Sequence, residues 1–213
     1  MNTDDLIAAL AQDTRPVSPH AIERGVLAAL PAGLAVSAAV MLAWLGLRAD
    51  FATAMYTPEF WLKLAYPLAV GVGALALGLK LVRPGVAPGA RTWLAAAPFV
   101  VMALLGAAAF GAAPPETRAA VWLGGSWDLC PLFVLALSLP PFIALFAAFR
   151  RAAPTRPAWA GFVAGLAAGG FGAFVYALSC DETGVPFLAT WYTLGMLLSG
   201  AIGGLLGRRL LKW

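Results

Sequence analysis

The chain has 213 residues, of which 62% are hydrophobic and only 11% are charged, and its mean hydropathy is +0.84. Soluble domains carry about 25% charged residues, so this composition excludes an ordinary soluble protein and indicates an integral membrane protein. The net charge is +4, but Lys and Arg stand in twos and threes beside apolar runs, which argues against direct nucleic-acid binding.

Residues 1–24 form a polar N-terminal segment without the basic start and short apolar core of a signal peptide. Within it, the stretch TDDLIAALAQ predicts a short amphipathic helix capped by Asn2 or Thr3. Three Asp and no basic residue precede Arg15, so anionic lipid should repel this helix and a basic protein should attract it. The alternative is a frayed tail or a helix folded back on the membrane domain.

Residues 25–213 predict one membrane domain with an all-α fold. A spanning helix needs roughly 20 mainly apolar residues, and six windows meet this requirement. They lie near 25–47, 60–82, 92–113, 129–149, 157–179 and 185–207. Several prolines fall inside these windows, where they are expected to kink a packed helix rather than end it. These are Pro31, Pro67, Pro98, Pro140 and Pro141.

The connections between the windows predict the orientation. Eleven of the 14 Lys and Arg fall on the side that holds both termini. Because positively charged loops tend to stay in the cytoplasm, both termini are expected to be cytoplasmic. The location that follows for a bacterial protein is the inner membrane, with six passes through the lipid bilayer. Most tryptophans fall at the ends of the windows and are expected to anchor the helices at the membrane interface.

Small residues recur every fourth position in the last two windows. They are Gly161, Gly165 and Gly169 in the fifth window and Gly195, Ser199, Gly203 and Gly207 in the sixth. Such stripes let membrane helices approach closely, so the two helices are predicted to pack as a tight hairpin.

Both cysteines fall on the side opposite the termini, with acidic residues nearby. Cys130 follows Asp128, and Cys180 precedes Asp181 and Glu182. Three interpretations stay open for the pair: a disulfide, a site for a soft metal ion, or two small apolar packing residues. The candidate metal ligands are Cys130, Cys180, Asp128, Asp181 and Glu182.

Catalytic constellations are missing from the sequence, which favours a protein that is not an enzyme and needs no obligatory cofactor. His20 is the sole histidine and lies in the polar segment. No carboxylate lies in the middle of a window, and Lys63 is near enough to an interface to snorkel, which argues against a proton-coupled transporter. A thiol oxidase would need a C-x-x-C pair, and the chain has none.

The opening TDDLIAALAQDTRPV, the stretch WDLCPLFVLALSLPP and the stretch LSCDETGVPFLATWYTLGML resemble the NrsF-type membrane anti-sigma factors, a family of six-span bacterial proteins. The resemblance covers the whole chain. It implies a protein that holds an extracytoplasmic-function sigma factor inactive at the cytoplasmic face and releases it under stress outside.

The resemblance also implies roles for particular residues. Sigma-factor binding would fall on Asp4, Asp5, Leu6, Ile7, Leu10 and Asp13. Sensing of metal or oxidative stress would fall on Cys130 and Cys180, where a heavy-metal ion would bind as a signal. The alternative is a small metal or solute transporter that uses the same cysteines at its outer mouth.

Overall fold

The computed structural model describes residues 2–12, 20–83, 89, 91–152 and 154–212, and within these ranges it contains helices and no strand. Six helices are long and apolar enough to cross a membrane, as predicted. The first five are α2 (Ala21–Trp44), α4 (Pro58–Leu81), α5 (Arg91–Ala112), α7 (Cys130–Phe149) and α8 (Pro157–Tyr176). The sixth is continuous through α9 (Val185–Phe187), the π-helix η1 (Leu188–Tyr192) and α10 (Thr193–Leu210).

Three short helices complete the described chain: α1 (Thr3–Gln12), α3 (Phe51–Ala54) and α6 (Arg118–Leu123). The expected N-terminal amphipathic helix is therefore present as α1. Among the spans, the predicted first residue differs most for the first one, which is expected to begin near residue 25 and begins at Ala21.

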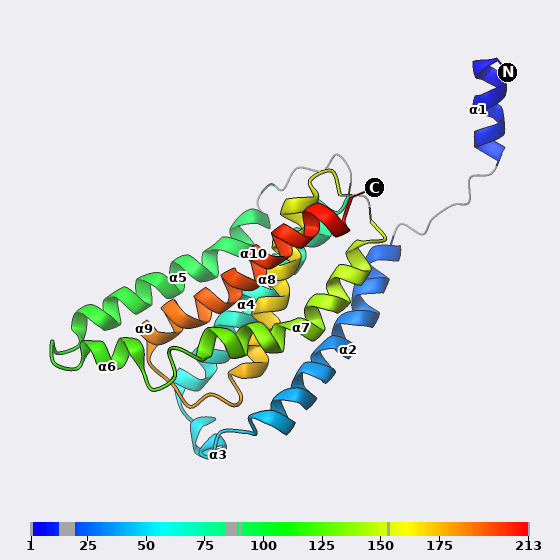
Figure 1. Ribbon diagram of the computed structural model, residues 1–213. Coiled ribbons are helices and arrows are strands. Elements are labelled where there is room, and N and C mark those ends of the chain that lie inside the picture. Colours follow the sequence, from blue (N-terminus) through cyan, green and yellow to red (C-terminus); the bar gives the residue numbers. More distant parts are fainter. Residues whose placement is uncertain (1, 13–19, 84–88, 90, 153, 213) are drawn as a thin grey trace.

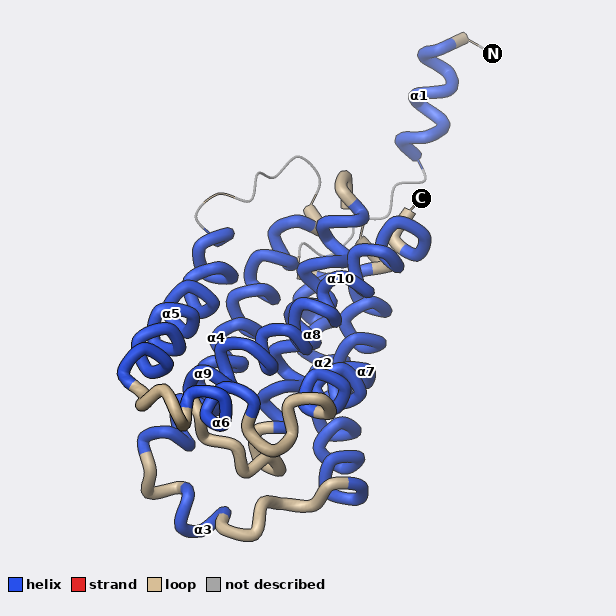
Figure 2. The backbone as a smooth tube through the Cα atoms, turned by 60° about the vertical axis from the view of Figure 1, so that its left-hand side comes forward, coloured by secondary structure: helices blue, strands red, loops and turns tan. Residues whose placement is uncertain are grey.

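Helix α8 lies in the middle of the bundle, packed against α4, α7 and α10 (Figures 1 and 2). Helix α2 packs on the far side of α7, and α5 packs on the far side of α4, so these two helices form opposite edges. The share of buried residues is highest in α8 and lowest in α5. A movement of α8 would therefore be felt by most of the bundle.

The predicted glycine hairpin between α8 and α10 is confirmed. Gly161 lies against the Gly203 carbonyl, and Gly165 lies against the Ser199 carbonyl, so closely that a Cβ atom at either glycine would collide with backbone. The Ser199 hydroxyl donates to the Gly165 carbonyl at 2.8 Å. Direct backbone contact of this kind replaces the hydrophobic driving force that membrane helices lack.

The two prolines of α7 are also accommodated inside a helix, as expected. Pro141 has no N–H to donate to Leu137, which would leave that carbonyl without its helical partner. The Ser37 hydroxyl of α2 donates to the Leu137 carbonyl instead, at 2.7 Å. Gly33, one turn earlier in α2, permits this approach because a Cβ there would come within 3.0 Å of the Pro140 carbonyl oxygen.

The two ends of the bundle differ in charge. One end, hereafter the basic end, contains the start of α2 and the end of α10, together with Arg24, Lys80, Arg83, Arg150, Arg151, Arg156, Arg208, Arg209 and Lys212. The opposite end, hereafter the cysteine end, contains the loops that carry Arg48, Asp128 and Cys180. Exposed tryptophans lie near both ends, as predicted: Trp44, Trp61, Trp93, Trp122, Trp127 and Trp159.

The hairpin can be tested with one substitution and a matched control. Gly165→Ala forces the α8 and α10 backbones apart, so the free energy of unfolding should fall by about 1–3 kcal/mol, the usual cost of overpacking. Gly111→Ala in α5, which has nothing within 4 Å, should be neutral or stabilise by up to about 1 kcal/mol. Denaturant unfolding of the detergent-solubilised protein measures both. Equal stabilities would contradict the close packing.

Candidate functional site

Both cysteines lie in the core of the cysteine end, and both are free thiols. Cys130 is the first residue of α7, and its N–H donates to the Ser126 carbonyl at 2.9 Å. Cys180 lies in the loop from 177 to 184 between α8 and α9, hereafter the cysteine loop. The structure places both residues at this one end of the bundle, and they are only 0% and 5% exposed, which agrees with the interpretation of two small apolar packing residues.

The side chain of Lys63, in α4, is hydrogen-bonded to the backbone of the cysteine loop. Its ammonium donates to the Cys180 carbonyl at 2.7 Å and to the Glu182 carbonyl at 2.6 Å. It also lies 5.6 Å from the centre of the Tyr192 ring, close enough for a cation–π interaction. A buried charge is costly unless it is hydrogen-bonded, and these carbonyls supply that compensation.

The sequence-based expectation that Lys63 snorkels to the interface is therefore wrong. The side chain is 0% exposed and points into the bundle, because two loop carbonyls without helical partners are within its reach. A charge inside an apolar window is itself a signal of a functional position, and this signal would have identified Lys63.

Arg48, in the loop after α2, fixes the same segment from the other side. Its guanidinium pairs with both carboxylate oxygens of Asp50, at 2.6 and 2.8 Å, and donates to the Cys180 carbonyl at 3.4 Å. Its backbone N–H donates to the Leu178 carbonyl. The hydrogen bond between the side chains lowers the pKa of Asp50 and raises the pKa of Arg48, so both stay charged at neutral pH.

Glu182 ties the cysteine loop to the segment before α7. Its carboxylate accepts hydrogen bonds from the Gly125 N–H at 2.5 Å and from the Ser126 hydroxyl at 3.5 Å. Gly124 has a φ of +60°, and a Cβ there would approach the Glu182 carboxylate within 2.6 Å. The glycine pair in GGSWDLC thus lets this carboxylate reach the backbone beside Cys130.

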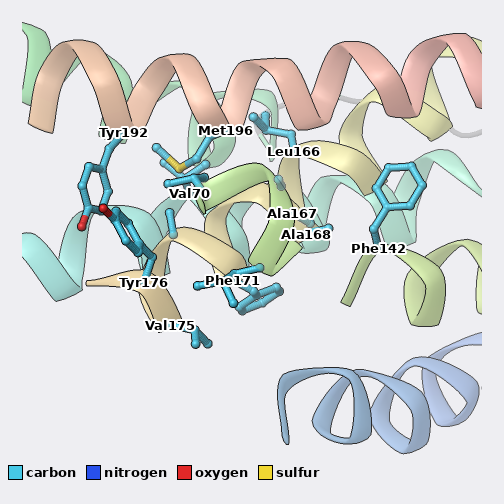
Figure 3. Close-up of a cluster of buried hydrophobic side chains, with 14 of the residues drawn as sticks. Val70, Phe142, Leu166, Ala167, Ala168, Phe171, Val175, Tyr176, Tyr192 and Met196 are labelled. Atoms are coloured by element: carbon cyan, nitrogen blue, oxygen red, sulfur yellow. The ribbon is translucent and has the colours of Figure 1, made fainter. Parts of the chain in front are cut away.

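Two tyrosines, Tyr176 and Tyr192, are buried in the core of the cysteine end. Tyr176 and Tyr192 lie side by side, with ring centres 5.6 Å apart (Figure 3). The Tyr192 hydroxyl is buried and has no hydrogen-bond partner within the described residues. Tyr192 ends the π-helix η1, whose wider turn is a feature often found at functional sites. The Lys63 ammonium, bonded to the Cys180 carbonyl and lying over the Tyr192 ring, joins the cysteine loop to this tyrosine pair.

The predicted metal ligands do not converge. Asp128 and Asp181 are exposed, whereas the thiols are buried and the Glu182 carboxylate is bound to backbone. In the described part of the chain, no group of three or more His, Cys, Asp or Glu side chains is placed to hold a metal ion. The geometry instead makes the cysteine end a hydrogen-bonded latch, formed by Lys63, Arg48 and Glu182 on the cysteine loop.

At the other end of the chain, α1 presents the predicted docking residues to solvent (Figure 1). The Asn2 N–H donates to the Asp5 carboxylate at 3.3 Å, an N-terminal cap that the acidic first turn supports. The apolar side chains of Leu6, Ile7 and Leu10 are 42%, 59% and 65% exposed. By the 3.6-residue period of the helix, Asp5 lies opposite this stripe and Asp4 lies at its edge, next to Ile7. Asp13 lies outside the described residues.

Comparisons with known proteins agree across nearly the whole chain. Residues 10–213 match the family NrsF, described as a negative regulator of sigma F. The probable anti-sigma-F factor NrsF of Azospira oryzae is 41% identical, and the anti-sigma-F factor NrsF of Caulobacter vibrioides is 40% identical. Each comparison covers 100% of both chains. No solved structure matches.

The latch predicts that thiol reactivity depends on Lys63. In Lys63→Met, the Glu182 carbonyl loses this donor and the Cys180 carbonyl keeps only its longer hydrogen bond from Arg48. The loss costs about 1–3 kcal/mol, so the cysteine loop should open more often. Alkylation of the thiols by a maleimide should accelerate by about tenfold, the factor that 1.4 kcal/mol represents. Lys63→Arg, which keeps the charge and the donors, serves as the control. Equal alkylation rates in Lys63→Met and the wild type would refute the latch.

Proposed function

The chain belongs to the NrsF family of negative regulators of sigma F, and on this basis we propose that it sequesters an extracytoplasmic-function sigma factor at the cytoplasmic face of the bacterial inner membrane. Metal or oxidative stress, acting on the cysteine end from outside, releases that sigma factor. The protein is thus a regulator rather than an enzyme, and its partner is a protein rather than nucleic acid.

Exposure of α1 is the observation that carries the docking role. An apolar stripe that faces solvent costs free energy unless a partner covers it, and α1 has no basic residue to bind it to anionic lipid. A surface that grips DNA is basic, so the acids of α1 complement the DNA-binding surface of a sigma factor while the stripe supplies apolar anchors. Occupying that surface keeps the sigma factor from its promoter.

Charge supports the orientation. The basic end carries most of the Lys and Arg of the chain and belongs in the cytoplasm, where α1 meets the sigma factor. The cysteine end then faces the space outside, where oxidants and metal ions arrive. The cysteines and the docking helix α1 belong to opposite ends of the bundle, so the signal must pass through the spanning helices.

The latch provides a route for that signal. Oxidation of a thiol or its binding of a soft metal enlarges a side chain inside a close-packed core. The cysteine loop must then move, which breaks its hydrogen bonds to Lys63 and Arg48 and releases the end of α8. Because α8 contacts α2, α4, α7 and α10, both ends of the bundle can bias the same two-state arrangement.

The transporter alternative gains no support from the relatives, which are named as anti-sigma-F factors. Among the described residues, the cysteine end also gathers no group of three or more His, Cys, Asp or Glu side chains that could hold a metal ion in transit.

Aspartate substitutions on two different faces of α1 test the docking role. Leu6→Asp with Leu10→Asp removes the apolar anchors and should reduce capture of the sigma factor by at least about tenfold, the factor that 1.4 kcal/mol represents. Ala8→Asp with Ala9→Asp adds the same charge on the face of Asp4 and Asp5, and should preserve capture. Pull-down from membranes with the full-length chain measures both. Unchanged capture by the first pair would rule out α1 as the docking helix.

A further inference from the structure

A groove runs between α5 and α8 toward the basic end. Helix α5 contacts α4 and, at the cysteine end, α9 and η1, but it hardly touches α8, which leaves a groove between α5 and α8. The space enclosed is about 420 Å³. Its walls are apolar and come from α4, α5, α8 and α10; they include Leu77, Ala95, Phe99, Val163, Leu166 and Leu197.

The rim of this groove at the basic end is polar and cationic. Arg156, which precedes the first residue of α8, lines the groove with an exposed side chain and makes no ion pair with any described residue. Trp159 lines it one turn later, in a T-shaped contact with Phe162 in which the ring centres are 5.8 Å apart. Thr92, near the start of α5, adds a hydroxyl on the opposite wall.

We propose that this groove binds one anionic phospholipid of the cytoplasmic leaflet. An acyl chain covers the apolar walls, and the headgroup phosphate pairs with the Arg156 guanidinium. Arg suits a phosphate because its planar fork of donors matches the phosphate oxygens.

Both halves of the groove are needed to specify this ligand. A soluble anion would pair with Arg156 but leave the apolar walls uncovered, and an apolar helix of a second copy would cover the walls but leave the guanidinium unpaired. Only a molecule with a hydrocarbon chain and a negative group at the interface complements the whole groove. Trp159 is exposed in the first turn of the spanning helix α8, and tryptophans are enriched where spanning helices meet the lipid headgroups, so the rim is expected at headgroup depth.

The test uses the full-length protein in detergent, titrated with an equimolar mixture of phosphatidylglycerol and phosphatidylethanolamine and observed by native mass spectrometry. One phosphatidylglycerol should be retained roughly fivefold better than phosphatidylethanolamine, since one Arg near an anionic headgroup contributes on the order of 1 kcal/mol. Arg156→Gln should abolish this preference. Arg24→Gln, an exposed arginine of the basic end on the far helix α2, should keep it.

A second variant tests the apolar half of the site. Ala96→Trp fills the groove and should remove the tightly held lipid of either class while Arg156 stays in place. Equal retention of the two lipids by the wild type, or an unchanged preference in Arg156→Gln, would overturn the proposal. A dimer that Ala96→Trp dissociates, without bound lipid, would assign the groove to a second copy instead. Each of these results leaves the role of α1 untouched.

Discussion

The buried ammonium of Lys63, bonded to the carbonyls of Cys180 and Glu182, is the contact on which the cysteine end depends. A charge in a low-dielectric core is held there only while its hydrogen bonds last. Its acceptors belong to a loop rather than to a helix, so these hydrogen bonds last only while the loop keeps its conformation. The same loop carries a thiol, and any chemistry that enlarges the thiol therefore acts on the hydrogen bonds of this buried ammonium.

Close packing determines how far such a disturbance travels. The α8 and α10 backbones touch through Gly161, Gly165 and Gly203, which leaves no soft layer of side chains to absorb a shift. Packed interfaces of this kind tend to move between discrete arrangements rather than deform gradually. Helix α8 starts next to Arg156 at the basic end and leads into the cysteine loop at its other end. It therefore joins the latch to the lipid-facing rim of the basic end.

Much of the fold could be predicted from the sequence, because membrane helices are specified by local patterns. The apolar windows predict the spans, and the spacing of small residues predicts the hairpin of α8 and α10. The acidic first turn and the apolar stripe predict α1. The inward turn of Lys63 could not be predicted in this way, since its acceptors lie in a loop 117 and 119 positions away in the chain. Burial of both cysteines and the capture of Glu182 by the Gly125 N–H follow from the same loop geometry, which no periodicity encodes.

We propose that the state of the thiols at the cysteine end controls how α1 is presented at the basic end. The most direct measurement is the affinity of the full-length protein, in lipid nanodiscs, for its purified sigma factor before and after alkylation of the thiols. The affinity of the wild type should fall on alkylation, while that of the double variant Cys130→Ser with Cys180→Ser should not change. An affinity that is the same for the alkylated and the free wild-type protein would contradict the coupling.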